Sequence, residues 1–254
     1  MRVAKWVGVL GMALLVAVLV PAAHATSITF TTVAGSDGDG AIAGTVQFIP
    51  LTGRIEIVVT NTETANMAKG QAISGFSFSV TGVGIPTAFT ELSGVQATLT
   101  GASSWTLSSG TAFDNTGSGP AIDHWGFAPS GSTVGIATAG SSVSGATGNP
   151  HYMILPSSGT TQGGSSLDNG NFDPNIIGPG TFFLTDAGVT TSTDLTNDIS
   201  GVTVSFGTGP DKTLLTTPKT VLTTVPEPGT ISMLGLGVVG LLGLSLLVRK
   251  QALG

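Results

Sequence analysis

The 254-residue sequence contains no cysteine and few charged residues, and each shortage excludes a class of protein. Without cysteine, the chain can form no disulfide, thiol redox centre or cysteine-ligated zinc site. Charged residues make up 9% of the chain, against about a quarter in a typical soluble domain. Only eight residues are Lys or Arg, whereas nucleic-acid binders normally present a basic face. We therefore expect no nucleic-acid partner.

The few basic residues are placed unevenly, and half of them flank two long apolar runs at the ends of the chain. The segment between these runs, residues 26–225, holds four basic and thirteen acidic residues, a net charge of −9. The predicted body of the protein is therefore strongly acidic, although the formal charge of the whole chain is only −6.

The N-terminus has the three parts of a secretory signal peptide. Arg2 and Lys5 precede an uncharged apolar run, and Ala23 and Ala25 follow it with the spacing of an A-x-A cleavage site. Signal peptidase needs small side chains at these two positions. We therefore predict a signal peptide over residues 1–25, removed by signal peptidase during export.

The C-terminus has a second uncharged run, over residues 230–248, which is rich in Leu, Val and Gly. As a helix it would be about 28 Å long, close to the thickness of the hydrocarbon core of a bilayer. Arg249 and Lys250 follow it directly, and basic residues of this kind stay on the cytoplasmic side. We predict a single helix across the inner membrane, with the body on the outer side.

A short motif precedes this run: Pro226-Glu227-Pro228. Together with the apolar run and the basic pair, residues 226–254 resemble the PEP-CTERM sorting signal of Gram-negative bacteria. The resemblance implies recognition by an exosortase, a membrane-embedded processing enzyme, followed by release or transfer to the cell surface or an exopolysaccharide matrix. Pro226, Glu227, Pro228, Arg249 and Lys250 are the site residues that it implies.

The body has the pattern of an all-β protein. Glycine, at 38 of 254 residues, is about twice as frequent as usual, as expected for a chain with many turns. Polar and apolar residues alternate in several segments, which is the pattern of half-buried strands; these are residues 27–33, 54–59, 73–80 and 202–206. The denser segments 152–155 and 181–184 are predicted to be central strands. We expect an antiparallel β-sandwich or jelly roll over residues 26–207, and then a strand and stalk over 208–225.

The sequence offers little support for a catalytic site. Only His124 and His151 remain after removal of the signal peptide, and no serine lies in a G-x-S-x-G motif. A glycosidase needs two carboxylates about 5–10 Å apart, but nothing in the sequence brings together any two of the body's glutamates, Glu56, Glu63 and Glu91. We predict a protein that is not an enzyme and has no cofactor.

Two loops carry several oxygen ligands of the kind that calcium prefers. They contain Asp37-Gly38-Asp39-Gly40 and the segment from Asp168 to Asp173. Neither has the spacing of an EF-hand, and aspartate beside glycine or asparagine is also typical of turns. We predict turns at both loops and assign no metal site.

Trp125 allows two interpretations. An exposed tryptophan on a secreted β-domain could stack on a sugar ring, whereas Trp125 and Phe127, two residues apart, would share the inner face of a strand. Core packing is the preferred interpretation, and it applies to Trp105 too.

Taken together, these features predict an exported, non-enzymatic protein with a structural or adhesive role at the cell surface or in a secreted matrix. A carbohydrate-binding module is the alternative, and a secreted glycan hydrolase is less favoured. The expected partners are signal peptidase, an exosortase, the inner membrane and an exopolysaccharide.

Overall fold

The structure of the protein is a computed structural model. It describes residues 26–64, 68–97, 99–100, 106–107, 111–119, 121–122, 124–138, 150–157, 172–209 and 212–221. The predicted signal peptide, the predicted membrane helix over 230–248, all the predicted sorting residues and Trp105 lie outside these ranges. Within them, no helix has the length and apolar character needed to span a membrane.

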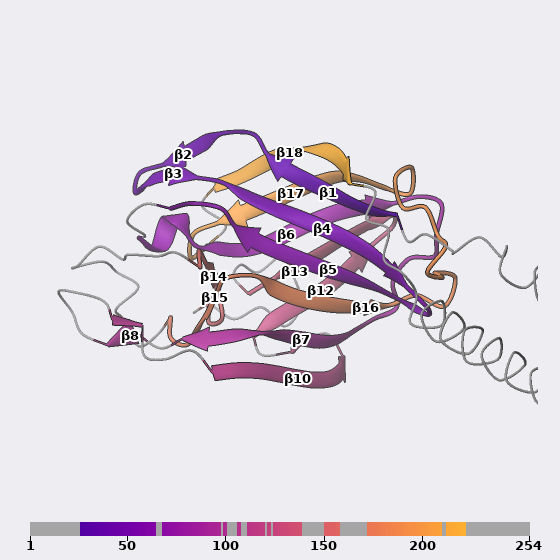
Figure 1. Ribbon diagram of the computed structural model, residues 1–254. Helices are drawn as coiled ribbons and strands as arrows, with labels where there is room; N and C mark the ends of the chain where they lie inside the picture. Colours follow the sequence, from indigo (N-terminus) through magenta and orange to yellow (C-terminus); the bar gives the residue numbers. More distant parts are fainter. Residues whose placement is uncertain are drawn as a thin grey trace, which may run out of the picture. The chain divides into compact units, whose positions relative to one another are not determined.

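The regular secondary structure of the described chain is almost entirely β-strand, which confirms the all-β prediction (Figure 1). The strands are β1 (Ser27–Thr32), β2 (Gly35–Asp37), β3 (Gly40–Ile42), β4 (Gly44–Leu51), β5 (Arg54–Asn61), β6 (Ile73–Val80), β7 (Ala88–Ala97), β8 (Leu99–Thr100), β9 (Thr106–Leu107), β10 (Thr111–Gly119), β11 (Ala121–Ile122), β12 (Trp125–Ser130), β13 (Thr133–Ala137), β14 (Ile154–Leu155), β15 (Asn175–Ile177), β16 (Gly180–Thr185), β17 (Ile199–Phe206) and β18 (Lys212–Val221). A short 3₁₀ turn, η1 (Lys69–Gln71), precedes β6.

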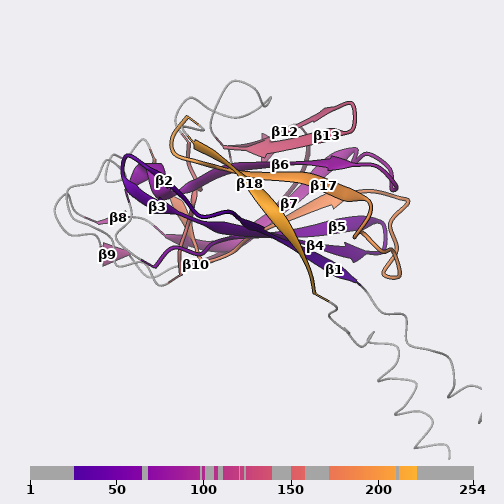
Figure 2. The same ribbon diagram turned by 90° about the horizontal axis from the view of Figure 1, so that it is seen from above.

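Fourteen of the strands belong to one sheet, which is largely antiparallel (Figures 1 and 2). Its hydrogen-bonded path runs β6-β14-β15-β7-β16-β5-β4-β1-β18-β17, and β17 pairs again with β6. The path therefore closes on itself, whereas a sandwich has two separate sheets. The closure depends on the two short strands β14 and β15, which pair in parallel and join β6 to β7.

The inner face of this sheet encloses one hydrophobic core. On β5, Ile55, Ile57 and Val59 are fully buried, while the residues between them face outward. This alternation is what a strand with one face toward the core requires. Burial of each large apolar side chain stabilises the fold by about 1.5–3 kcal/mol, so in a chain without cysteine this core is a main source of stability.

Most of the predicted strands are confirmed, with shifted ends. Those expected at 27–33, 54–59, 73–80 and 202–206 are β1, β5, β6 and β17, and the one expected at 181–184 is β16, which lies between β5 and β7. The strand expected at 152–155 is shorter, because Tyr152 has a left-handed backbone with φ of 57°. Only its last two residues form β14.

The first and last strands of the described chain lie side by side. Ser27 pairs with Val221, and Thr32 pairs with Thr216. The chain therefore enters β1 and leaves β18 at the same end of the body, as Figure 2 shows. Lys212 lies at the other end of β18 from Val221. Because β18 has ten residues, the two ends are about 30 Å apart.

Candidate functional site

The predicted sorting residues follow the body closely in sequence. β18 ends at Val221, and Pro226 is only five residues further on. The described residues therefore extend almost to the motif, but the motif itself lies outside them. The body has three other places where polar or aromatic side chains gather.

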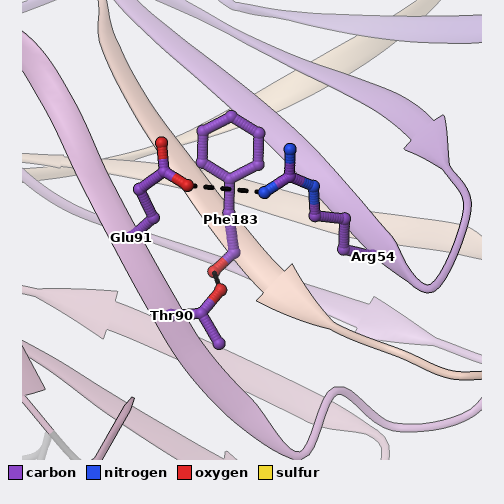
Figure 3. A network of polar contacts seen from close by, with 4 residues as sticks. All are labelled: Arg54, Thr90, Glu91 and Phe183. Atoms are coloured by element: carbon purple, nitrogen blue, oxygen red, sulfur yellow. Dashed lines mark hydrogen bonds and ion pairs between the residues drawn. The ribbon is translucent and has the colours of Figure 1, made fainter. Parts of the chain in front are cut away.

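The first place is a group of charged residues on the outer face of the sheet (Figure 3). The register places Glu56 of β5 opposite Phe183 of β16, and Phe183 opposite Glu91 of β7. The guanidinium of Arg54 lies 4.3 Å from the centre of the Phe183 ring, and its Nη1 atom lies 3.4 Å from Oε2 of Glu91. A β-bulge in β7 takes Thr90 out of the residue pairing with β16. The hydroxyl of Thr90 donates a hydrogen bond to the Phe183 carbonyl, at 3.2 Å.

This arrangement brings together two of the three glutamates that the sequence left apart. Partial burial raises the pKa of Glu56, and the Glu91 carboxylate raises it further, whereas the charge of Arg54 lowers it. Paired carboxylates can serve acid–base chemistry. Here, however, Arg54 covers the aromatic ring and forms the ion pair with Glu91, so these groups are directed at one another. The cluster has the features of a structural contact between strands.

The raised pKa of Glu56 predicts a pH-dependent stability. In the folded state the Glu56 carboxyl binds its proton more tightly than in the unfolded chain. The stabilisation that this gives the fold is present at low pH and is lost as the pH rises through the folded pKa. Glu56→Gln should therefore have a higher Tm than the parent at pH 7, and the difference should vanish below about pH 4. Thermal denaturation between pH 3.5 and 8 measures this. Glu63→Gln, just beyond the end of β5, is the control for the loss of one acidic charge.

The second place is a hollow of about 580 Å³ where the β2–β3 hairpin approaches η1 and the start of β18. Its charged lining residues are Asp37, Asp39, Lys69 and Lys212. Oδ1 of Asp37 accepts hydrogen bonds from the backbone N–H groups of Asp39 and Gly40, at 2.8 and 3.0 Å. These are the bonds of an Asx turn, which confirms the turn interpretation for this loop.

The other aspartate-rich loop is described only from residue 172 onward, so Asp168 lies outside the described ranges. Across the described part of the chain, no group of three or more His, Asp or Glu side chains is placed to hold a metal ion.

Trp125 lies in the core and is fully buried, so the core-packing interpretation is confirmed. Its ring centre lies 4.8 Å from that of Phe182 and 6.4 Å from that of Phe76, and Phe127 is also buried. Its indole Nε1–H donates to the carbonyl of Tyr152, at 3.1 Å. The carbohydrate-binding alternative therefore loses the exposed tryptophan on which it depended.

The third place lies next to Trp125, where the two histidines of the body meet. The ring centres of His124 and His151 are 4.5 Å apart, and His124 also lies 6.3 Å from the Tyr152 ring. His124 and Tyr152 are the only non-glycine residues in the described ranges with positive φ, 66° and 57°. A left-handed backbone costs a non-glycine residue about 1–3 kcal/mol, so the surrounding contacts must hold both residues in place.

Several hydrogen bonds hold His151 and the neighbouring Tyr152 in place. Thr138 Oγ1 donates to the carbonyl of His151, at 2.6 Å, and the N–H of Tyr152 donates to the carbonyl of Pro174, at 2.6 Å. Nδ1 of His151 also forms a hydrogen bond with the carbonyl of Asp173. Nothing in the sequence predicts that these two histidines meet, because the contact joins distant loops.

Comparison with known proteins concerns the C-terminal tail. Residues 224–250 match the family model of the PEP-CTERM protein-sorting motif, which confirms the resemblance seen in the sequence. The matched range includes Pro226, Glu227 and Pro228 as well as Arg249 and Lys250. Searches of curated proteins and of solved structures found no match to the chain.

Proposed function

We propose that this chain is an exported protein that an exosortase recognises at Pro226-Glu227-Pro228 and processes before delivery to the cell surface or a secreted matrix. The observation that carries the proposal is the sorting motif matched at residues 224–250. In this proposal, residues 230–248 hold the chain in the inner membrane before processing. Arg249 and Lys250 stay on the cytoplasmic side.

The composition of the motif suits this role. Each proline fixes its own φ and disfavours a helical conformation in the residue before it, so Glu227 is kept in an extended segment. An extended charged segment at the membrane surface is accessible to an enzyme embedded in the same membrane. The few residues between Val221 and Pro226 would keep the body close to the site of processing.

For the body we propose a structural or adhesive role, without catalysis. The body is built around an apolar core, and its net charge of −9 between residues 26 and 225 opposes binding to nucleic acid or anionic lipid. β1 begins and β18 ends at the same end of the body, so the tail continues from that end. An exopolysaccharide is the partner that the sorting route implies.

A stop codon at position 230 tests the sorting route. The shortened chain lacks the membrane run and the basic pair, so we expect soluble body in the periplasm, whereas the full-length chain reaches the surface or the matrix. Immunoblots of the cell fractions measure the distribution. If the shortened chain still reached the same location as the full-length chain, the proposal would fail.

The motif can be tested separately in the full-length chain. Glu227→Ala combined with Pro226→Ala should leave a longer form, still held in the inner membrane, because the processing enzyme no longer recognises it. The control is Glu63→Ala, which also removes one acidic charge but should be processed normally. Normal processing of the motif variant would contradict the assignment of these residues.

A further inference from the structure

The hollow beside the β2–β3 hairpin plays no part in the proposed sorting route. Its volume of about 580 Å³ lies within the range of about 300–1,000 Å³ of sites for small ligands. Its walls come from the hairpin, at the left of Figure 1, from η1 and from the start of β18. Because Lys212 and Val221 lie at the two ends of β18, the hollow lies far from the point where the chain continues toward the sorting motif.

Two of the four basic residues of the body, Lys69 and Lys212, line this hollow. Neither side chain forms an ion pair or a hydrogen bond with any residue in the described ranges. Arg54, by contrast, is paired with Glu91. The body has a net charge of −9, so two unpaired ammonium groups beside one hollow create a local attraction for an anion.

Asp37 and Asp39 line the same hollow, but their carboxylates are already bonded to the protein. Oδ1 of Asp37 accepts from the N–H groups of Asp39 and Gly40. Oδ2 of Asp39 accepts from the N–H of Gly70, at 3.0 Å. Backbone donors of this kind stabilise a carboxylate without a cation, and the remaining oxygen atoms can accept from hydroxyl groups. The hollow therefore lacks an anion, while its two ammonium groups oppose a metal cation.

The wall that carries these carboxylates is fixed in advance. Gln71 of η1 is buried, and its Nε2 donates to the carbonyl of Ala41 in β3, at 2.8 Å. A Cβ atom added at Gly70 would clash with Oδ2 of Asp37 and lie 2.7 Å from Oδ2 of Asp39. A glycine at this position thus lets both carboxylates pack against η1. Groups held in this way lose little conformational freedom on binding, which increases affinity.

We propose that this hollow binds an acidic sugar unit of a polysaccharide, with the sugar carboxylate paired to Lys69 and Lys212 and the sugar hydroxyls donating to Asp37 and Asp39. Two positive and two negative charges line the hollow, which suits a ligand with one negative charge and several neutral donors. A phosphate group would bring up to two negative charges close to both aspartates and is less favourable.

The choice of a polysaccharide rests on the proposed function, because an exopolysaccharide is the partner that the sorting route implies. The site needs no exposed tryptophan. Charge and hydrogen bonds, instead of stacking on an aromatic ring, provide the recognition.

The test is a calorimetric titration of the purified full-length chain with a trisaccharide that contains one glucuronate. We expect it to bind at least about ten times more tightly than the same trisaccharide with glucose in place of glucuronate, because the neutral sugar loses the charge-assisted hydrogen bonds to the lysines. For the same reason, Lys69→Gln and Lys212→Gln should each weaken binding of the acidic trisaccharide by about ten-fold. Both variants should keep the parent Tm, since neither lysine side chain is bonded to the protein.

Lys219→Gln is the matched control, because it removes the same charge from the same strand at a residue that does not line the hollow. It should bind the acidic trisaccharide as the parent does. An equal loss of affinity in this control would overturn the proposal, since overall charge would then explain the binding. Equal affinity for the two trisaccharides, or no binding of either, would overturn it too.

Two further ligands distinguish an acidic sugar from other anions. Inorganic phosphate and the zwitterionic dipeptide glycylglycine should both bind more weakly than the acidic trisaccharide, and tighter binding of either would contradict the proposal. The titration uses purified protein, so its result does not depend on where the cell delivers the chain. Failure of the stop-codon experiment would overturn the sorting route but would leave a measured affinity for the acidic sugar unchanged.

Discussion

Trp125→Ala is expected to lower the free energy of unfolding by about 3–5 kcal/mol, the range for removal of a large aromatic side chain from a core. Trp125 is fully buried, and its ring contacts Phe76 and Phe182. The surrounding strands belong to a sheet that closes on itself, so they cannot collapse freely into the cavity. Loss of the indole N–H also leaves the carbonyl of Tyr152 without this donor.

Urea denaturation of the purified chain measures this effect. Trp125→Phe separates the two contributions, because it keeps an aromatic ring but removes the donor. It should cost less than the alanine variant, with about 0.5–1.5 kcal/mol due to the lost hydrogen bond. Leu215→Ala is the control for a general effect of truncation, since Leu215 is 68% exposed and its loss should change stability by no more than about 0.5 kcal/mol. A similarly small change for Trp125→Ala would show that Trp125 does not pack as described.

Asn61→Leu should destabilise the fold by about 3 kcal/mol, because it removes a buried polar link between three segments. Asn61 is only 2% exposed. Its Nδ2 donates to the carbonyls of Gln71, at 2.8 Å, and Ile154, at 3.2 Å, and its Oδ1 accepts from the N–H of Glu63, at 3.1 Å. Leucine has a similar volume but satisfies none of these groups.

The part of the fold that Asn61→Leu destabilises can be measured, as well as the size of the destabilisation. Hydrogen exchange should show faster exchange at β14 and η1 in Asn61→Leu, since the side chain ties both to the end of β5. Gln47→Leu is the matched control. The amide of Gln47 makes one half-buried bond to Ser27 Oγ, at 3.2 Å, so its loss should cost less than about 1 kcal/mol. An equal decrease in the free energy of unfolding in Asn61→Leu and Gln47→Leu would contradict the role given to Asn61.

The strands that sequence reasoning located correctly are those whose pattern is local. In β5 the apolar residues Ile55, Ile57 and Val59 alternate with residues that face outward, and this period of two requires no knowledge of the neighbouring strands. The same argument placed Trp125 and Phe127 on one buried face. The sorting motif is local too, because its prolines, apolar run and basic pair are contiguous.

The features that could not be predicted depend on which strands become neighbours. Glu56 and Glu91 come together only because β16 lies between β5 and β7. His124 and His151 meet across loops that have no periodic pattern. Closure of the sheet rests on β14 and β15, which are too short for their pattern to be recognised. Pairing between distant segments is set by the packing of the whole core, and a single sequence does not record it.

The pairing of β18 has a mechanical consequence for a protein held by its C-terminal tail. Tension on such a tail enters the body at Val221, at the end of a ten-residue strand that is hydrogen-bonded to β1 on one side and β17 on the other. A pull along this strand must shear the bonds on both sides together, whereas a pull across it would open them one by one. Forced unfolding is governed by the unfolding rate, and shear loading keeps that rate low. If the tail is held as proposed, β18 is the strand through which drag on the body would first be carried.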